Sequence, residues 1–369
     1  MSQDSHDQNI ASSFSLWKWI AWTAAILAGI GVANTAVDRH RMEQLRTEVE
    51  SRGGRLEGSY FVPDWYKWLE SKAPSGWPKQ AVLKLKGNFQ RVVAVRLPPG
   101  TVLPHNFISR LTRFRSLAHL ELPDCHLSDA DLDHLSEFSN LRYLDLRGNL
   151  VSDGGLAHLD KLVLLEQVHL PGTRAGDEVL RQAATLPNLR FLNLSRTSVT
   201  DAGLQGLRTH LKLRYLVLDG TQISDSGLAS LLPQPSLVNL TLNHCAITDK
   251  GLAAIDDSRF PALGQLEVRK TQVTADGISR LRLSHLRDYQ FPNASLTDEH
   301  WLALARMKSL VWVHWGEIHL RREFERSSSR RRIALDSFVV IYDGHIGEPQ
   351  RLRVPLPRRF PQSSVSEFQ

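Results

Sequence analysis

The chain has 369 residues, of which 42% are hydrophobic and 23% are charged, and its formal net charge is +6 at pH 7. This composition excludes a disordered or collagen-like chain and predicts one large folded domain with flanking segments. Two cysteines, Cys125 and Cys245, are too few for a disulfide framework. Ten Arg against six Asp and Glu lie in residues 320–369, so the rest of the chain is not a basic nucleic-acid surface.

After an N-terminal tail of residues 1–18, the uncharged segment 19–37 (WIAWTAAILAGIGVANTAV) predicts a single transmembrane helix. At about 1.5 Å per residue, it is long enough to cross a hydrocarbon core of about 30 Å. A cleaved signal peptide and a buried helix are the alternatives, and the sequence GVA at 31–33 fits a cleavage site. The length of the apolar run and the acidic leading tail favour the anchor.

The charges that flank this segment predict its orientation. Only Lys18 precedes it, whereas several arginines follow it: Arg39, Arg41, Arg46, Arg52 and Arg55. Because basic residues stay on the cytoplasmic side, we expect the body of the protein to be cytoplasmic.

Small residues recur every four positions along the same segment, at Ala21, Ala25, Gly29 and Ala33. Such a stripe lets two helices approach closely and would allow self-association through this segment. An alanine-rich segment also gives this spacing by chance, so both interpretations stay open.

Two short helices are predicted between the anchor and the repeats. Residues 38–51 have a polar, helix-favouring composition and form most of a juxtamembrane segment, 38–58. Residues 62–78 are rich in Trp and end at two prolines. They lie in segment 59–91, which we expect to cap the first repeat, because a solenoid otherwise exposes the edge of its core. Contact of these tryptophans with a membrane surface is the alternative.

From residue 117 the sequence repeats with a period of about 24 residues. The units open at Leu117, Leu141, Leu165, Leu189, Leu213, Leu237, Leu263, Leu286 and Leu310. Most of the spacings are 24 residues, and the two exceptions are 26 and 23. This period is typical of leucine-rich repeats. With VVAVRL at 92–97 as a degenerate first unit, the array is predicted to have about ten units over residues 92–320.

One unit shows how such an array folds. Leu192 and Leu194 alternate with polar residues, which predicts a strand with these two side chains turned inward. Leu204 and Leu207 are three residues apart, which predicts a returning helix with one apolar stripe. Neither face can be buried within one unit, so the units must stack. The predicted fold is an α/β solenoid, a leucine-rich-repeat horseshoe with parallel strands on the concave face and short helices on the convex face.

The ninth position of each unit, where the chain turns inward, holds a small or hydrogen-bonding residue. Cys125 and Cys245 are at this position, five units apart, so they are predicted to be buried free thiols that cannot bond to each other. After it follows a recurring Ser/Thr-Asp-x-Gly-Leu, as in Thr200, Asp201 and Gly203. The hydroxyl is predicted to cap the helix and the carboxylate to favour its positive end, which makes this motif part of the outer scaffold.

The unit LxxLxLxxTxVTDxGLxxL, seen at 189–207 and 213–231, resembles the repeats of a membrane-anchored family of planctomycete bacteria. It is also similar to the cysteine-containing repeats of eukaryotic F-box proteins. The upstream GGRLEGSY at 53–60 is similar to the segment before the array in the bacterial family. The sequence departs from the pattern at 173–180, where Gly176 replaces Ser or Thr, and at 271–278, where the Asp moves one place. The resemblance implies the fold and a bacterial, membrane-anchored protein, but no particular ligand.

No sequence motif indicates catalysis, a metal site or a cofactor. Repeat solenoids bind partners on the concave face, so the outward strand positions are the candidates. The predicted partner-binding residues are Tyr143, His169, Phe191, Asn193, Tyr215 and Trp312. The alternative is that aromatic residues simply suit strands.

After the array, residues 321–369 form an Arg-rich tail with a possible hairpin around Asp343 and Gly344. The tail is either a solvated connector or a segment that adheres to anionic lipids. The whole sequence predicts a membrane-anchored scaffold that binds a protein or peptide without catalysis. The alternatives are a soluble or secreted adaptor, such as the substrate receptor of a ubiquitin ligase, and an enzyme with its site in the C-terminal piece.

Overall fold

The computed structural model describes residues 40–60, 90–231, 233–290, 304, 309–315, 318–322 and 338–342. The chain divides into two compact units, Met1–Pro98 and Pro99–Gln369, which are treated separately below. The predicted transmembrane helix 19–37, its stripe of small residues and the Trp-rich helix 62–78 lie outside the described residues. Within the described ranges, no helix is both long enough and apolar enough to cross a membrane.

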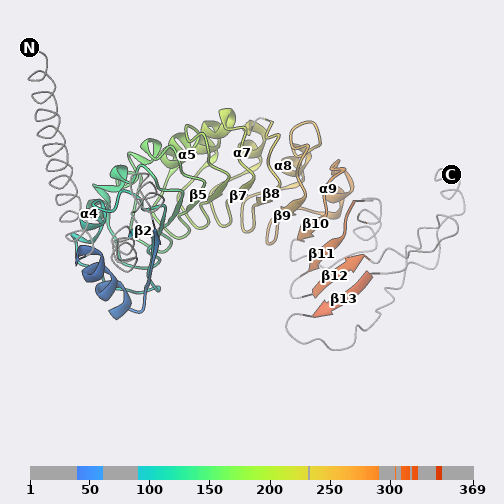
Figure 1. Ribbon diagram of the computed structural model, residues 1–369. Coiled ribbons are helices and arrows are strands. Elements are labelled where there is room, and N and C mark those ends of the chain that lie inside the picture. Colours follow the sequence, from blue (N-terminus) through green and yellow to red (C-terminus); the bar gives the residue numbers. More distant parts are fainter. Residues whose placement is uncertain are drawn as a thin grey trace, which may run out of the picture. The chain divides into compact units, whose positions relative to one another are not determined.

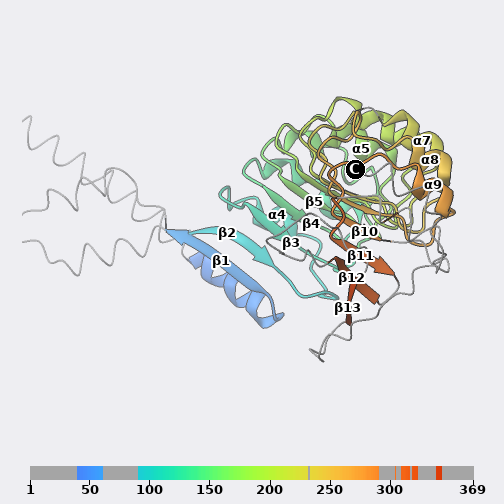
Figure 2. The same cartoon turned by 90° about the vertical axis from the view of Figure 1, so that its right-hand side faces the viewer.

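The first unit contains a helix at residues 40–51 and a β-hairpin (Figure 2). The hairpin pairs β1 (Arg55–Tyr60) with β2 (Gln90–Arg96) in antiparallel register. The helix confirms the one predicted at 38–51, and its buried residues Met42, Leu45 and Val49 follow helical spacing. Most of the segment expected to be the first repeat strand, 92–97, lies in β2. Its antiparallel pairing with β1 differs from the parallel pairing within the repeats.

In the second unit, each repeat contributes one short strand to a parallel sheet. These strands are β3 (His119–Glu121), β4 (Tyr143–Asp145), β5 (Gln167–His169), β6 (Phe191–Asn193), β7 (Tyr215–Val217), β8 (Asn239–Thr241), β9 (Gln265–Glu267), β10 (Asp288–Gln290) and β11 (Trp312–Trp315). Neighbours in sequence are neighbours in the sheet, and equivalent positions pair, as Phe191 does with Tyr215. The predicted strands are confirmed, and side chains at one repeat position therefore form rows across the sheet.

Short helices return the chain along the other side of the second unit, which is the outer side in Figure 1. Before the first repeat strand lies α4 (Phe107–Leu111), and the first two repeats return through 3-10 turns, η2 (Asp129–Leu132), η3 (Leu135–Glu137) and η4 (Leu159–Lys161). The following repeats use α5 (Asp177–Ala183), α6 (Asp201–Leu204) with η5 (Gln205–Thr209), α7 (Asp225–Ser230), α8 (Asp249–Ala253) and α9 (Ala275–Ser279). The strands thus face one side of this unit and the helices the other.

The core of the second unit lies between these two layers. Leu189, Leu192 and Leu194 of one repeat are fully buried, and so are Leu204 and, almost fully, Leu207 of its helix. At roughly 1.5 to 3 kcal/mol for each buried aliphatic side chain, this repeated set is the main source of stability. The alternation predicted from the sequence is confirmed.

Two further strands continue the sheet beyond the parallel repeats. β12 (Ile318–Arg322) pairs antiparallel with β11, and β13 (Phe338–Tyr342) pairs antiparallel with β12. The strand expected at the start of the C-terminal hairpin therefore pairs with residues that precede the tail. Asp343 and Gly344 lie outside the described residues.

Hydrogen bonds at the ninth position support the turns after the strands. The hydroxyls of Thr197 and Thr221 donate to the carbonyl oxygens of Leu194 and Leu218, both at 2.6 Å. The Cys245 thiol donates to the Leu218 carbonyl at 3.2 Å. Cys125 and Cys245 are both buried and free, as predicted.

The recurring Asp bonds to the next repeat, which the sequence did not indicate. Asp carboxylates accept from the backbone N–H of the Ser or Thr one repeat later, in the pairs Asp129–Ser152, Asp177–Thr200, Asp201–Ser224, Asp225–Thr248 and Asp249–Thr274. The hydroxyls of the same residues donate to the second carboxylate oxygen. Where Gly176 lacks a hydroxyl, only its N–H reaches Asp153, at 2.7 Å. The motif is scaffold, as predicted, but it ties repeats together as well as capping helices.

Candidate functional site

Five aromatic side chains form one continuous row over strands β3 to β7. His119 stacks on Tyr143 with ring centroids 5.8 Å apart, and Tyr143 lies 5.0 Å from His169. His169 stacks on Phe191 at 4.5 Å, and Phe191 lies 5.9 Å from Tyr215. We call these five residues the aromatic row. It brings together four of the predicted binding residues and adds His119, which was not among them.

His169 joins the row from a different repeat position than the others. The third position of β5 holds Gln167, which is exposed, so the row would have a gap on this strand. His169, at the fifth position, fills the gap between Tyr143 and Phe191. Sequence alternation correctly placed His169 on the strand face, but only the structure shows that its ring completes the row.

The packing of the rings decides what the row can offer a ligand. Interplanar angles of 24° to 35° mean that neighbouring rings lie partly face to face. Such pairs contribute about 0.5 to 1.5 kcal/mol each beyond their burial. Their faces are largely used within the row, so mainly ring edges remain for a partner. Tyr215, at the end of the row, is the most accessible ring, with 37% of its surface exposed.

A buried ion pair supports the row beneath Tyr143. The Asp145 side chain is only 1% exposed, and its Oδ2 accepts from Arg147 Nε at 2.8 Å. Burial raises the pKa of Tyr143, and the carboxylates of Asp145 and Glu121 add to this effect. Tyr143 is therefore a neutral hydroxyl at physiological pH.

His169 is the one ring of the row with a strongly buried nitrogen. Its Nε2 is buried and hydrogen-bonds to none of the described residues. Burial lowers the pKa of His169, and the negative charge of Asp145 opposes this effect only in part. The imidazole is therefore neutral at neutral pH and serves as a packed ring.

Arginines border the row at the second position of the repeats. Arg142 donates to Glu166 Oε1 at 2.6 Å. Arg190 and Arg214 are exposed, and the Arg214 guanidinium lies 5.9 Å from the centroid of the Tyr215 ring. The exposed end of the row is thus positively charged.

Two predicted binding residues do not join the row. Asn193 Oδ1 accepts from the N–H of Ser195 at 3.0 Å and from its hydroxyl at 2.8 Å, so this side chain stabilises its own turn. Trp312 is on β11, which pairs with β10 and lies four strands from β7. At about 4.8 Å per strand, this separation is about 19 Å. The side chain of Trp312 is outside the described part of the structure.

The strand face beyond the row is polar. Asn243 Nδ2 donates to Asp219 at 3.2 Å and to Glu267 at 2.8 Å, and Gln265 also donates to Glu267, at 2.9 Å. These side chains mainly bond to one another. The aromatic half and the polar half therefore differ in what they leave free for a partner.

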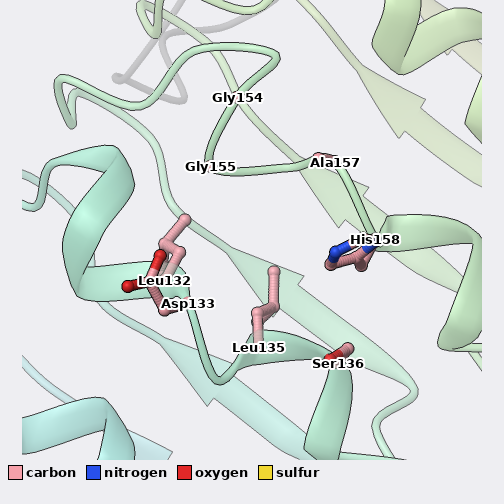
Figure 3. A pocket seen from close by; sticks show the side chains of 8 residues that line it. All are labelled: Leu132, Asp133, Leu135, Ser136, Gly154, Gly155, Ala157 and His158. Carbon is pink, nitrogen blue, oxygen red and sulfur yellow. The ribbon is translucent and has the colours of Figure 1, made fainter.

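A small cavity of about 210 Å³ lies on the helix side, between the returns of the first two repeats (Figure 3). It is lined by Leu132, Asp133, Leu135, Ser136, Gly154, Gly155, Ala157 and His158. Its polar side chains lie at separate edges and do not hydrogen-bond to one another (Figure 3). No group of three or more His, Cys, Asp or Glu among the described residues could hold a metal ion. The aromatic row is thus the better candidate site.

Four segments of the chain, residues 139–159, 185–207, 209–232 and 234–255, match the family described as Leucine Rich repeat. The second unit is therefore a leucine-rich-repeat solenoid with a parallel sheet. No curated protein matches the chain.

Two solved structures are similar to it. One is an internalin (inlF) from Listeria monocytogenes, at 18% identity and a TM-score of 0.44, covering 69% of this chain and 67% of that one. The other is the ectodomain of the plant membrane receptor kinase GASSHO1/SCHENGEN3 from Arabidopsis thaliana in complex with CASPARIAN STRIP INTEGRITY FACTOR 2. It is 17% identical with a TM-score of 0.37, and the alignment covers 62% of this chain and 30% of that chain.

Proposed function

We propose that the protein is a binding scaffold that captures a protein or peptide on its strand face and performs no covalent chemistry. The observation that carries this proposal is the aromatic row, because a self-stacked set of rings presents a preformed apolar surface at little cost in side-chain entropy. Tyr and Arg are also the residue types that most often dominate protein interfaces. The exposed end of the row, with Tyr215 and Arg214, has both.

The same proposal includes a membrane anchor at residues 19–37, with the repeats on the cytoplasmic side. Its support is the uncharged length of this segment, the arginines that follow it and the resemblance of the repeats to a bacterial membrane-anchored family. Protease treatment of intact and opened cells tests it. The repeats should be cleaved only after opening, and a chain lacking residues 1–18 and 19–37 in the mature form would contradict it.

A photo-crosslinking residue placed on the strand face tests the binding function. Gln167 on β5 is exposed and borders the row, and Gln205 is exposed on the helix side, so the same replacement at Gln205 is a matched control. We expect a specific crosslinked partner from position 167 and not from position 205. Replacing Tyr143, Phe191 and Tyr215 together by Ala should abolish this crosslink. An unchanged crosslink in the folded triple variant would disprove the role of the row.

A further inference from the structure

Two exposed arginines lie side by side at the accessible end of the aromatic row. Arg190 and Arg214 directly precede Phe191 and Tyr215, which are paired neighbours on β6 and β7. Equivalent positions on adjacent strands are about 4.8 Å apart. Two like charges this close repel each other unless an anion lies between them.

The neighbouring acid does not neutralise this pair. Glu166 precedes the adjacent strand β5, and its carboxylate accepts from Arg142 at 2.6 Å. The outward residues that follow on β6 and β7 are uncharged, namely Asn193 and Val217. Within the described part of the chain, no carboxylate forms an ion pair with Arg190 or Arg214.

An apolar surface adjoins the two guanidinium groups. The rings of Phe191 and Tyr215 and the side chain of Val217 share the strand face of β6 and β7. Tyr215 is 37% exposed, and the Arg214 guanidinium lies 5.9 Å from its ring centroid, so the charged and apolar parts are continuous. One ligand segment could therefore contact both.

We propose that the ligand is a peptide segment in which an Asp or Glu carboxylate binds Arg190 and Arg214 while a neighbouring aromatic or aliphatic side chain covers Tyr215 and Phe191. This inference rests on the proposed function and names the chemistry of the partner. A carboxylate accepts two parallel N–H bonds from one guanidinium or one from each of two, and the planar donors of Arg suit this better than Lys would. The positive edges of the stacked rings also favour the backbone carbonyls of such a segment.

A selection from a displayed library of random 12-residue peptides on the full-length protein tests this chemistry. We expect enrichment of peptides with Asp or Glu next to an aromatic or aliphatic residue. Changing the acid of a selected peptide to its amide should weaken binding about tenfold in fluorescence anisotropy, and the affinity should fall as salt rises. Enrichment without an acid, or with Lys or Arg in its place, would overturn the proposal.

Matched variants separate this inference from the proposed function. The double variant Arg190→Gln and Arg214→Gln should lose the preference for acidic peptides and still fold, because both side chains are exposed. Arg280→Gln changes the charge of an exposed residue on the helix side and should leave binding unchanged. Peptides that need Tyr143, Phe191 and Tyr215 but not the two arginines would refute only the acidic ligand. Selection of no peptide at all would count against both proposals.

Discussion

The carboxylate of Asp177 accepts two hydrogen bonds from Thr200 in the next repeat, 2.8 Å from its backbone nitrogen and 2.7 Å from its hydroxyl. Thr200 in turn caps the helix that it precedes, because its hydroxyl oxygen accepts from the N–H of Ala202 at 3.3 Å. One hydroxyl thus serves its own helix as an acceptor and the preceding repeat as a donor. This double use explains why Ser or Thr and Asp recur together along the array.

Thr200→Ala should lower the free energy of unfolding by about 1 to 2 kcal/mol, because the variant loses the cap and the bond to Asp177. Thr200→Ser keeps both hydrogen bonds and is the matched control. Urea denaturation followed by circular dichroism measures the difference. Peptide affinity should stay nearly constant in both variants, since Thr200 lies on the side opposite the aromatic row. A loss of affinity without a loss of stability would show that the motif has a binding role.

Gly227→Ala should destabilise the protein by about 1 to 3 kcal/mol, although Ala is the better helix former. A Cβ at Gly227 would lie against the Asp201 carboxylate, with Cγ at 2.9 Å and the Asp201 Cα at 3.3 Å. Asp201 cannot move away because Ser224 holds it. Gly264→Ala is the control, since its Cβ would meet no atom closer than 3.8 Å. Equal thermal unfolding temperatures for the two variants would contradict this account.

The stability of the protein should depend on the protonation of His169. Burial lowers its folded-state pKa below the unfolded value of about 6.5, assisted by Arg147 and opposed by Asp145 and Glu121. The unfolded chain therefore binds more protons as the pH falls through about 6.5, and the free energy of unfolding decreases. His169→Phe keeps a ring in the row and removes this contribution.

Urea denaturation at pH 8 and pH 5.5 checks this prediction. The loss of stability between the two pH values should be smaller in His169→Phe than in the unmodified protein. The exposed His158 on the helix side provides the control variant, His158→Phe. If both variants lost as much stability as the unmodified chain, His169 would not be the titrating group.

The two thiols should be unreactive in the folded protein. Burial raises the pKa of Cys125 to about 11 and also raises that of Cys245. Because the thiolate is the reactive form, a disulfide reagent at pH 8 should label neither residue until the chain is unfolded. Counting labelled thiols with and without denaturant gives the answer. Fast labelling of either cysteine in the native state would contradict its burial at the ninth position.

The sequence alone determined the repeat architecture. Leucines at a period of about 24 residues require stacked units, since Leu192 and Leu194 cannot be buried within one unit. Alternation along each strand then determined which residues face outward, including Tyr143, Phe191 and Tyr215. These features are periodic, and a period is visible in a single sequence.

Only the tertiary structure decided how equivalent positions meet. Parallel pairing in register places residues 24 apart beside each other, so His169 enters the gap that Gln167 leaves, and Asp177 reaches Thr200. The same pairing leaves Arg190 and Arg214 adjacent without an acid between them, while Glu166 bonds to Arg142. The sequence contains no signal for these choices, because each depends on the side-chain packing of two or three neighbouring repeats.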